Sequence, residues 1–271
     1  MSEFNLVIKL TNWCNLNCRH CMERSGLDQP YQMMPVEQVK KYINEYKKLG
    51  HHITFTGGEP FASYIQERDE YIPEIATSCV QNRITPIFET NGTWAENMYV
   101  GGIMMSKLSE IAQNHRKDIF LDIAVDKYHP TPQGAANICK LIARHQHLRN
   151  NNNIRVTFSG QDCWWIGSKI SNCLVEPYYA FGGHEDHVSI YEHRELKVLI
   201  PLKKYILKYK GRAKDNNLTW QSVSETIDNP DSQDVLTITN DNQAILNHKY
   251  QTTMDNKTIE QVYSELLQHK R

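Results

Sequence analysis

The 271-residue sequence lacks several features that would assign it to a broad class of proteins. No uninterrupted apolar run approaches the roughly 18 residues that a membrane-spanning helix needs, and the N-terminus has no basic segment followed by an apolar core, as a signal peptide would have. Neither sign of charge dominates, because 30 Lys and Arg stand against 31 Asp and Glu, for a net charge of −1. We therefore expect a cytoplasmic protein that binds neither a membrane nor nucleic acid.

The cysteines are unevenly distributed along the chain. The seven cysteines are an odd number, and disulfides are not their default state in a reducing compartment. No cysteine follows Cys173, and there are no internal repeats or low-complexity tracts. Three cysteines lie together in "CNLNCRHC", whereas the other four are scattered along the chain: Cys79, Cys139, Cys163 and Cys173. For Cys79 and Cys139 we expect only packing within helices.

Strand patterns and helix patterns alternate through the first part of the chain. Short β-branched and apolar runs predict strands, and apolar residues at helical spacing separate them. Such alternation predicts a parallel sheet with right-handed crossovers, partly closed into a barrel. The fold class expected is α/β, a partial (β/α)6 TIM-like barrel. The five predicted strands are Phe4–Leu10, His52–Thr56, Ile84–Thr90, Ile119–Val125 and Asn153–Ser159.

The pattern changes near Asp215, where a small C-terminal appendage is expected. "VLTITNDNQAILN" alternates and turns at Asn240–Asn242, which predicts a β-hairpin. Thr258 and Gln261 have the spacing of a capping box before an amphipathic helix. We therefore assign residues 1–214 to the barrel and residues 215–271 to a hairpin-plus-helix appendage without cluster cysteines.

Cys14, Cys18 and Cys21 follow the spacing C-x3-C-x2-C in the loop after the first predicted strand. A structural zinc ion needs four closed ligands, and His20, directly beside Cys21, is poorly placed to be the fourth. A four-iron cluster on three thiolates keeps one iron without a protein ligand, open to a substrate or cofactor. The three cysteines therefore favour a catalytic iron–sulfur site, and a zinc-stabilised, non-enzymatic binding module is the alternative.

The stretch "IKLTNWCNLNCRHC" resembles the signature of the radical S-adenosylmethionine (SAM) enzymes, including Thr11 and Asn12 before the first cysteine and Asn15 after it. The resemblance implies one [4Fe–4S] cluster on Cys14, Cys18 and Cys21, with SAM chelating the open iron. An electron from the reduced cluster then cleaves SAM to methionine and a 5′-deoxyadenosyl radical, which abstracts hydrogen from a substrate. It also implies an external electron donor, such as a flavodoxin or ferredoxin, and places His20 beside the adenine.

A second motif, Gly57-Gly58-Glu59-Pro60, follows the second predicted strand. Two glycines let a ligand approach the backbone closely, and a glutamate is an acceptor for an ammonium group. The motif resembles the GGEP element of the same family, which binds the amino group of SAM.

Weaker resemblances place further residues at the SAM pocket. "ETNG" implies contacts from Thr90 and Asn91, although a helix-start turn explains these residues equally well. Asp126 matches an acidic position near the ribose, but Ala124 stands where the family often has a serine. Ser159, or its neighbour Thr157, could contact the ribose or the methionyl carboxylate, or cap a helix.

The loops after the fourth and fifth predicted strands supply candidate catalytic residues. Cys163 could donate a hydrogen atom to a substrate radical, His129 could act as a general acid or base, and Lys127 lies in the same predicted rim loop as His129. The simpler interpretation of Cys163 is a small buried residue. Trp164 and Trp165 could stack on a substrate, or belong to the core.

"KGRAK" at residues 210–214 resembles an element of peptide-modifying radical SAM enzymes, and the hairpin tail resembles a remnant of their auxiliary-cluster domain. A peptide is therefore the preferred substrate class. The short chain and the absence of cysteines after Cys173 favour the alternatives, a small metabolite or a glycyl-radical activase.

Overall fold

The structure is a computed structural model that describes residues 4–21, 23–125, 129, 132–144, 153–160, 170, 179–183, 187–192, 195–204, 234–247 and 249–270. Within these residues the strands are β1 (Phe4–Thr11), β2 (His52–Gly57), β3 (Thr85–Thr90), β4 (Ile119–Ala124), β5 (Ile154–Gly160), β6 (Tyr179–Gly183), β7 (His187–Glu192), β8 (Glu195–Lys204), β9 (Asp234–Ile238), β10 (Gln243–Leu246) and β11 (Tyr250–Thr253). The helices are α1 (Val36–Tyr46), α2 (Ala62–Glu67), α3 (Tyr71–Gln81), α4 (Met98–His115), α5 (Gln133–Arg144) and α9 (Ile259–Lys270), with a 3₁₀ turn, η1, at Thr93–Ala95.

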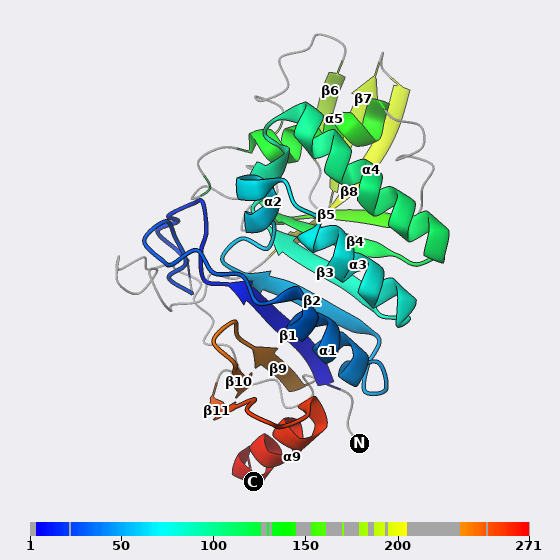
Figure 1. The fold of residues 1–271 in the computed structure, drawn as a ribbon. Coiled ribbons are helices and arrows are strands. Elements are labelled where there is room, and N and C mark those ends of the chain that lie inside the picture. Colours follow the sequence, from blue (N-terminus) through cyan, green and yellow to red (C-terminus); the bar gives the residue numbers. More distant parts are fainter. Residues whose placement is uncertain are drawn as a thin grey trace.

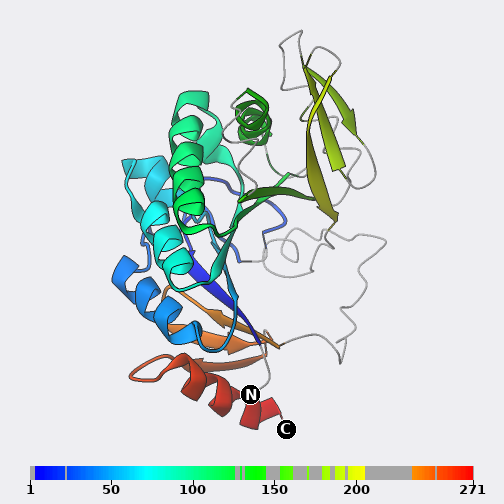
Figure 2. The same cartoon turned by 90° about the vertical axis from the view of Figure 1, so that its right-hand side faces the viewer.

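These strands form one open sheet in the order β11-β10-β9-β1-β2-β3-β4-β5-β8-β7-β6 (Figure 1). The run from β9 through β1 to β5 and β8 is parallel, whereas β6, β7, β10 and β11 are antiparallel to their neighbours. Helices α1, α3 and α4 cover the same face of the sheet (Figures 1 and 2). The expected α/β class, a partial barrel, is confirmed.

The sheet packs on its helices because its strands alternate in polarity. In β1, Phe4, Leu6, Ile8 and Leu10 are buried, and the residues between them are half-buried. The ring of Phe4 lies 5.4 Å from that of Tyr46 at the end of α1. Burying a side chain of this size stabilises the fold by roughly 1.5–3 kcal/mol. One face of β1 is therefore committed to the core, and the strand cannot slip by one residue without exposing it.

The C-terminal segment extends the main sheet. The β9 strand pairs in parallel with β1, from Phe4↔Asp234 to Ile8↔Ile238, and β10 returns antiparallel after the expected turn. Thr258 and Gln261 form the expected capping box, each backbone N–H donating to the other's side-chain oxygen. The expected domain boundary at residues 214 and 215 lies outside the described residues and remains a prediction.

Four strands, β6, β7, β8 and β11, correspond to no strand or hairpin predicted from the sequence. The β6–β7 and β7–β8 pairs are antiparallel, and β8 joins the parallel run beside β5 through Phe158↔Leu202. Counted from β1, β8 is thus the sixth parallel strand, the number that a (β/α)6 arrangement requires, and β9 adds a seventh on the other side of β1.

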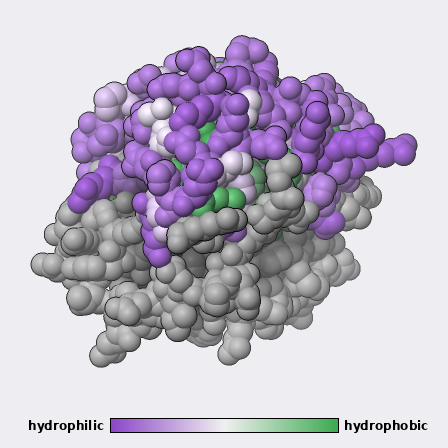
Figure 3. Space-filling model, turned by 90° about the horizontal axis from the view of Figure 1, so that it is seen from below, coloured by the Kyte–Doolittle hydropathy of each residue, from purple (hydrophilic) through white to green (hydrophobic). Residues whose placement is uncertain are grey.

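None of the helices in the described part of the chain is long and apolar enough to span a membrane. In the view of Figure 3 the described surface is mainly hydrophilic, with a small apolar area beside the atoms drawn in grey. This agrees with the absence of long apolar runs from the sequence.

Asn97 begins α4, the longest helix among the described residues, and provides a test of the fold. Its side-chain oxygen accepts hydrogen bonds from the backbone N–H groups of Tyr99 and Val100. Asn97→Ala should lower the free energy of unfolding by about 1 kcal/mol, because the N-terminal N–H groups of the helix lose their acceptor. Asn97→Ser keeps a side-chain acceptor, so its free energy of unfolding, measured by chemical denaturation, should fall much less. Equal losses in both variants would show that the cap contributes little.

Candidate functional site

The candidate site lies where the parallel strands end. Thr11, Gly57, Thr90, Ala124 and Gly160 are the last residues of β1 to β5. Because neighbouring parallel strands point the same way, the loops that follow them lie along one edge of the sheet. The loop with the three cysteines, the GGEP loop and the loop after β3 are therefore neighbours, as the sequence predicts.

The cysteine loop is anchored at its start. The Trp13 backbone N–H donates to Oγ1 of Thr11 at 3.0 Å, and the Cys14 N–H donates to the carbonyl of Gly26 at 3.3 Å. Cys14 is buried, whereas Cys18 and Cys21 are half-buried. The Cys21 N–H also donates to the carbonyl of Cys18 at 3.2 Å, which makes a tight turn between these two residues. The loop thus carries one fixed thiol at the end of β1 and two thiols at a turn.

The chemistry of these thiols fits a metal cluster. Burial raises the pKa of the Cys14 thiol to about 12, and the negative charges of Glu59, Cys18 and Cys21 add to the shift. A thiolate here needs a positive partner, which iron would supply. Among the described residues, no three Cys, His, Asp or Glu side chains are yet gathered as metal ligands.

The GGEP loop packs directly on the backbone of the cysteine loop. The Gly58 N–H donates to the carbonyl of Thr11 at 2.7 Å, and the Glu59 N–H donates to that of Trp13 at 3.0 Å. Gly57 has φ +122°, which disfavours other residues, and a Cβ atom on Gly58 would lie 1.8 Å from the Trp13 carbonyl oxygen. The sequence predicts close approach of a ligand here, and the structure shows that another strand of the same chain also approaches closely.

Glu59 is fully buried beneath this loop. Its Oε1 accepts hydrogen bonds from the Phe61 N–H at 3.0 Å and the Thr90 hydroxyl at 2.6 Å, and its Oε2 accepts one from the Asn91 N–H at 2.8 Å. Burial raises the pKa of this carboxyl, while the three hydrogen bonds and His129 oppose the shift. Since a carboxylate offers about four acceptor positions, one remains for a further donor.

The loop after β3 connects these elements. The Asn91 side chain donates from Nδ2 to Asn15 Oδ1 at 3.0 Å and to Cys14 Sγ at 3.6 Å. The "ETNG" stretch therefore reaches the cysteine loop through side chains. The sequence pattern carries no signal for this contact, since the two residues are 77 positions apart.

Other predicted residues are brought near the same edge. The rings of His20 and His129 lie 5.4 Å apart, so the loops after β1 and β4 meet. Ser159 donates its hydroxyl to Asp122, a buried carboxylate within β4. The sequence analysis missed Asp122, although a lone acid inside the apolar run "IFLDIAV" is a usable signal. Asp126, Lys127 and Cys163, together with Trp164 and Trp165, lie outside the described residues.

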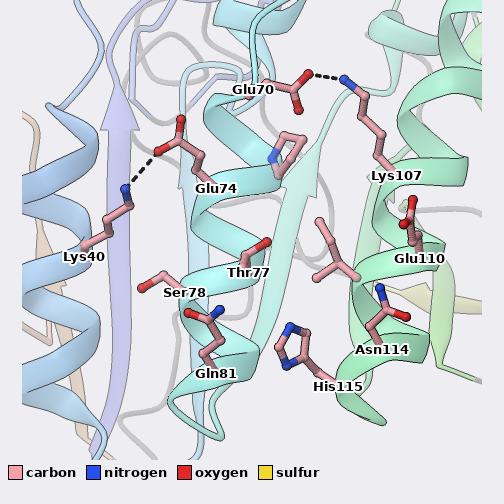
Figure 4. A pocket seen from close by; sticks show the side chains of 12 residues that line it. Lys40, Glu70, Glu74, Thr77, Ser78, Gln81, Lys107, Glu110, Asn114 and His115 are labelled. Carbon is pink, nitrogen blue, oxygen red and sulfur yellow. Dashed lines mark hydrogen bonds and ion pairs between the residues drawn. The ribbon is translucent and has the colours of Figure 1, made fainter.

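A polar groove lies elsewhere, on the helical side of the sheet between α3 and α4 (Figure 4). Lys107 of α4 pairs with Glu70 across its upper part, and Lys40 of α1 pairs with Glu74 on the other side of α3. None of the residues predicted for the site lines it. Exposed pairs of this kind contribute little to stability, and we assign the groove no chemistry.

Comparison with known proteins identifies the family. The profile described as "Radical SAM superfamily" matches residues 8–154, more than half of the chain. The chain belongs to the radical SAM superfamily. Members of this superfamily use a [4Fe–4S] cluster and SAM, so these are the cofactors of the chain. The match begins in β1 and ends at the first residue of β5, and it includes the cysteine, GGEP and "ETNG" loops.

Individual relatives cover less of the chain. A protein of Syntrophomonas wolfei named GTP 3′,8-cyclase is 35% identical over 91 residues, which are 32% of this chain and 26% of that protein. A probable GTP 3′,8-cyclase of Pyrococcus abyssi is 33% identical over 100 residues, 36% of this chain and 32% of that protein. The chain thus matches about a third or less of each relative. The crystal structure of Streptococcus suis SuiB bound to S-adenosylmethionine matches 97% of this chain and 65% of SuiB, with 10% identity and a TM-score of 0.46.

Gly58→Ala tests whether the two loops must touch. The added Cβ would displace the Trp13 carbonyl, so we expect a loss of about 1–3 kcal/mol in the free energy of unfolding, measured by chemical denaturation. Gly102→Ala in α4 is the matched control, because its Cβ would meet only Leu141 Cδ2 at 3.4 Å. A helical Gly→Ala change should be neutral or stabilise by up to about 1 kcal/mol. Similar effects at both positions would contradict the close packing.

Proposed function

We propose that the protein is a radical SAM enzyme. With the bound cluster reduced, SAM supplies a 5′-deoxyadenosyl radical that abstracts hydrogen from a substrate. The observation that carries the proposal is the packing of the GGEP loop on the cysteine loop, through Gly58 to Thr11 and Glu59 to Trp13. This contact supports the proposal because the GGEP loop, an element suited to SAM, packs on the loop that carries the three proposed cluster ligands.

The residues divide into three sets by chemistry. Cys14, Cys18 and Cys21 are proposed as the cluster ligands, because they are the three thiols of one loop. The remaining acceptor position of Glu59 suits the ammonium of SAM. The other proposed SAM contacts are His20, Gly57, Gly58, Pro60, Thr90, Asn91, Asp126 and Ser159. His129, Lys127 and Cys163 remain candidates for proton or hydrogen transfer to the substrate.

The cluster also needs an electron from outside the chain. The cysteine loop follows the C-terminal end of strand β1, and its thiols Cys18 and Cys21 are half-buried. The site is therefore close to the surface. A small redox protein such as a flavodoxin or ferredoxin is the proposed reductant.

A peptide is the proposed substrate class, and its support is the "KGRAK" element with the strands that follow it. The element itself lies outside the described residues. A small metabolite is the second candidate, favoured by the two relatives named GTP 3′,8-cyclase. Those alignments cover 26% and 32% of the relatives, so they support the shared chemistry more directly than a shared substrate.

Replacing any one of Cys14, Cys18 and Cys21 by alanine should abolish cluster binding and SAM cleavage, because two thiolates do not hold the cluster firmly. Iron and sulfide content after anaerobic reconstitution, together with release of 5′-deoxyadenosine, are the measurements. Cys79→Ala and Cys139→Ala are matched controls, since both thiols are buried in helices. A protein that stays colourless and binds one zinc ion would support the zinc-stabilised binding module instead.

The substrate class can be tested with the reconstituted wild-type protein, SAM and a chemical reductant. We expect 5′-deoxyadenosine release to rise several-fold above the substrate-free rate with a precursor peptide encoded beside the gene. The reason is that substrate binding completes the site and gives the radical a hydrogen to abstract. GTP serves as the comparison. A rise with GTP and none with the peptide would reverse the assignment.

A further inference from the structure

The Asn91 side chain lies between the loop after β3 and the cysteine loop. Its Nδ2 is 3.6 Å from Cys14 Sγ and 3.0 Å from Asn15 Oδ1. A second donor, the Leu16 backbone N–H, reaches the same sulfur at 3.4 Å. Cys14 is the buried member of the three thiols, so these donors act where water contributes little. The Cys14 sulfur thus accepts hydrogen bonds from two loops of the barrel edge.

The hydrogen bonds fix which end of the Asn91 amide faces the sulfur. Its Oδ1 lies 2.9 Å from the Thr93 backbone nitrogen, which can only donate. If the amide were flipped, two N–H donors would face each other there. The Thr93 hydroxyl also donates to Oδ1 at 2.7 Å, and that hydroxyl accepts from Asn15 Nδ2 at 2.8 Å. The NH₂ group therefore points toward Cys14.

The backbone of Asn91 is held as well. Its N–H donates to Glu59 Oε2 at 2.8 Å, and the preceding Thr90 hydroxyl donates to Glu59 Oε1 at 2.6 Å. Glu59 is fully buried and belongs to the loop that packs on the cysteine loop. The amide is thus anchored at its backbone by one loop and at its oxygen by Thr93. Such anchoring keeps a donor in place at little entropic cost when the cluster changes charge.

We propose that Asn91 is a positioning residue for the cluster, whose amide N–H group donates to the Cys14 thiolate and raises the reduction potential of the cluster. The inference rests on the proposed function, because it requires the cluster on Cys14. A reduced cluster carries one more negative charge than an oxidised one, so a donor to a ligand sulfur stabilises the reduced state more. This role differs from the SAM contact that the sequence suggests for Asn91.

The experiment is a redox titration of the reconstituted cluster without SAM, followed by electron paramagnetic resonance. At a fixed potential near the wild-type midpoint, we expect the ratio of reduced to oxidised cluster to fall several-fold in Asn91→Ala. A tenfold fall corresponds to 59 mV for a one-electron couple. In Asn91→Asp the ratio of reduced to oxidised cluster should fall further, since this change removes the donor and adds a negative charge beside the sulfur.

Two further variants separate this role from general destabilisation. Asn97→Ala removes the cap of α4 and should leave the midpoint unchanged. Thr93→Val keeps the Asn91 amide but removes the hydroxyl that donates to it, and should shift the midpoint by less, in the same direction. If Asn91→Ala does not retain iron, the midpoint potential of Thr93→Val is measured in its place.

The outcomes are distinct. If Asn91→Ala binds a full cluster with the wild-type midpoint potential, the inference is overturned and the proposed function is left intact. If Asn91→Ala does not retain iron, the same result in Thr93→Val overturns the inference. Failure of the wild-type protein to bind a four-iron cluster would overturn the proposed function itself. A shift of equal size in Asn97→Ala would show that the potential follows stability, and would also overturn the inference.

Discussion

The buried carboxylate of Glu59 is the constraint on which the site depends. A charge with no exposed surface must have hydrogen-bond donors, and here they come from its own loop and from the end of β3. The same loop is bonded to the first residues after β1 through its backbone. Loops from three different strands are therefore tied together before any cofactor binds. This arrangement reduces the motion that cofactor binding must arrest.

The motifs were predictable because their spacing reflects chemistry. Three thiols in "CNLNCRHC" indicate an iron site, and "GGEP" after a strand indicates a close approach of backbone. The capping box at Thr258 and Gln261 was predictable for the same reason, since a local pattern has a local hydrogen bond as its cause. The order of strands β1 to β5 followed from the regular alternation of strand and helix patterns.

The remaining features depend on contacts between distant residues. The sequence shows that Gly57 and Gly58 need space, but not that the Trp13 carbonyl occupies it. Nothing near Asn91 reveals its hydrogen bond to Cys14, and nothing near Asp234 reveals that β9 lies beside β1. Such pairings are decided by the tertiary fold, which local propensity does not specify. Asp122 was within reach of sequence analysis, because an acid in an apolar strand requires a buried partner.

The place of β9 in the sheet has a consequence for biosynthesis. Strand β1 leads into the cysteine loop, yet one of its two hydrogen-bonding edges is completed only by residues 234–238. During translation β1 emerges first and β9 more than two hundred residues later, so the nascent chain presents an unpaired parallel edge next to free thiols. Iron delivered to the nascent chain would meet a loop whose strand is still unsupported on one side. Maturation of the cluster is therefore expected only once β9 has docked beside β1.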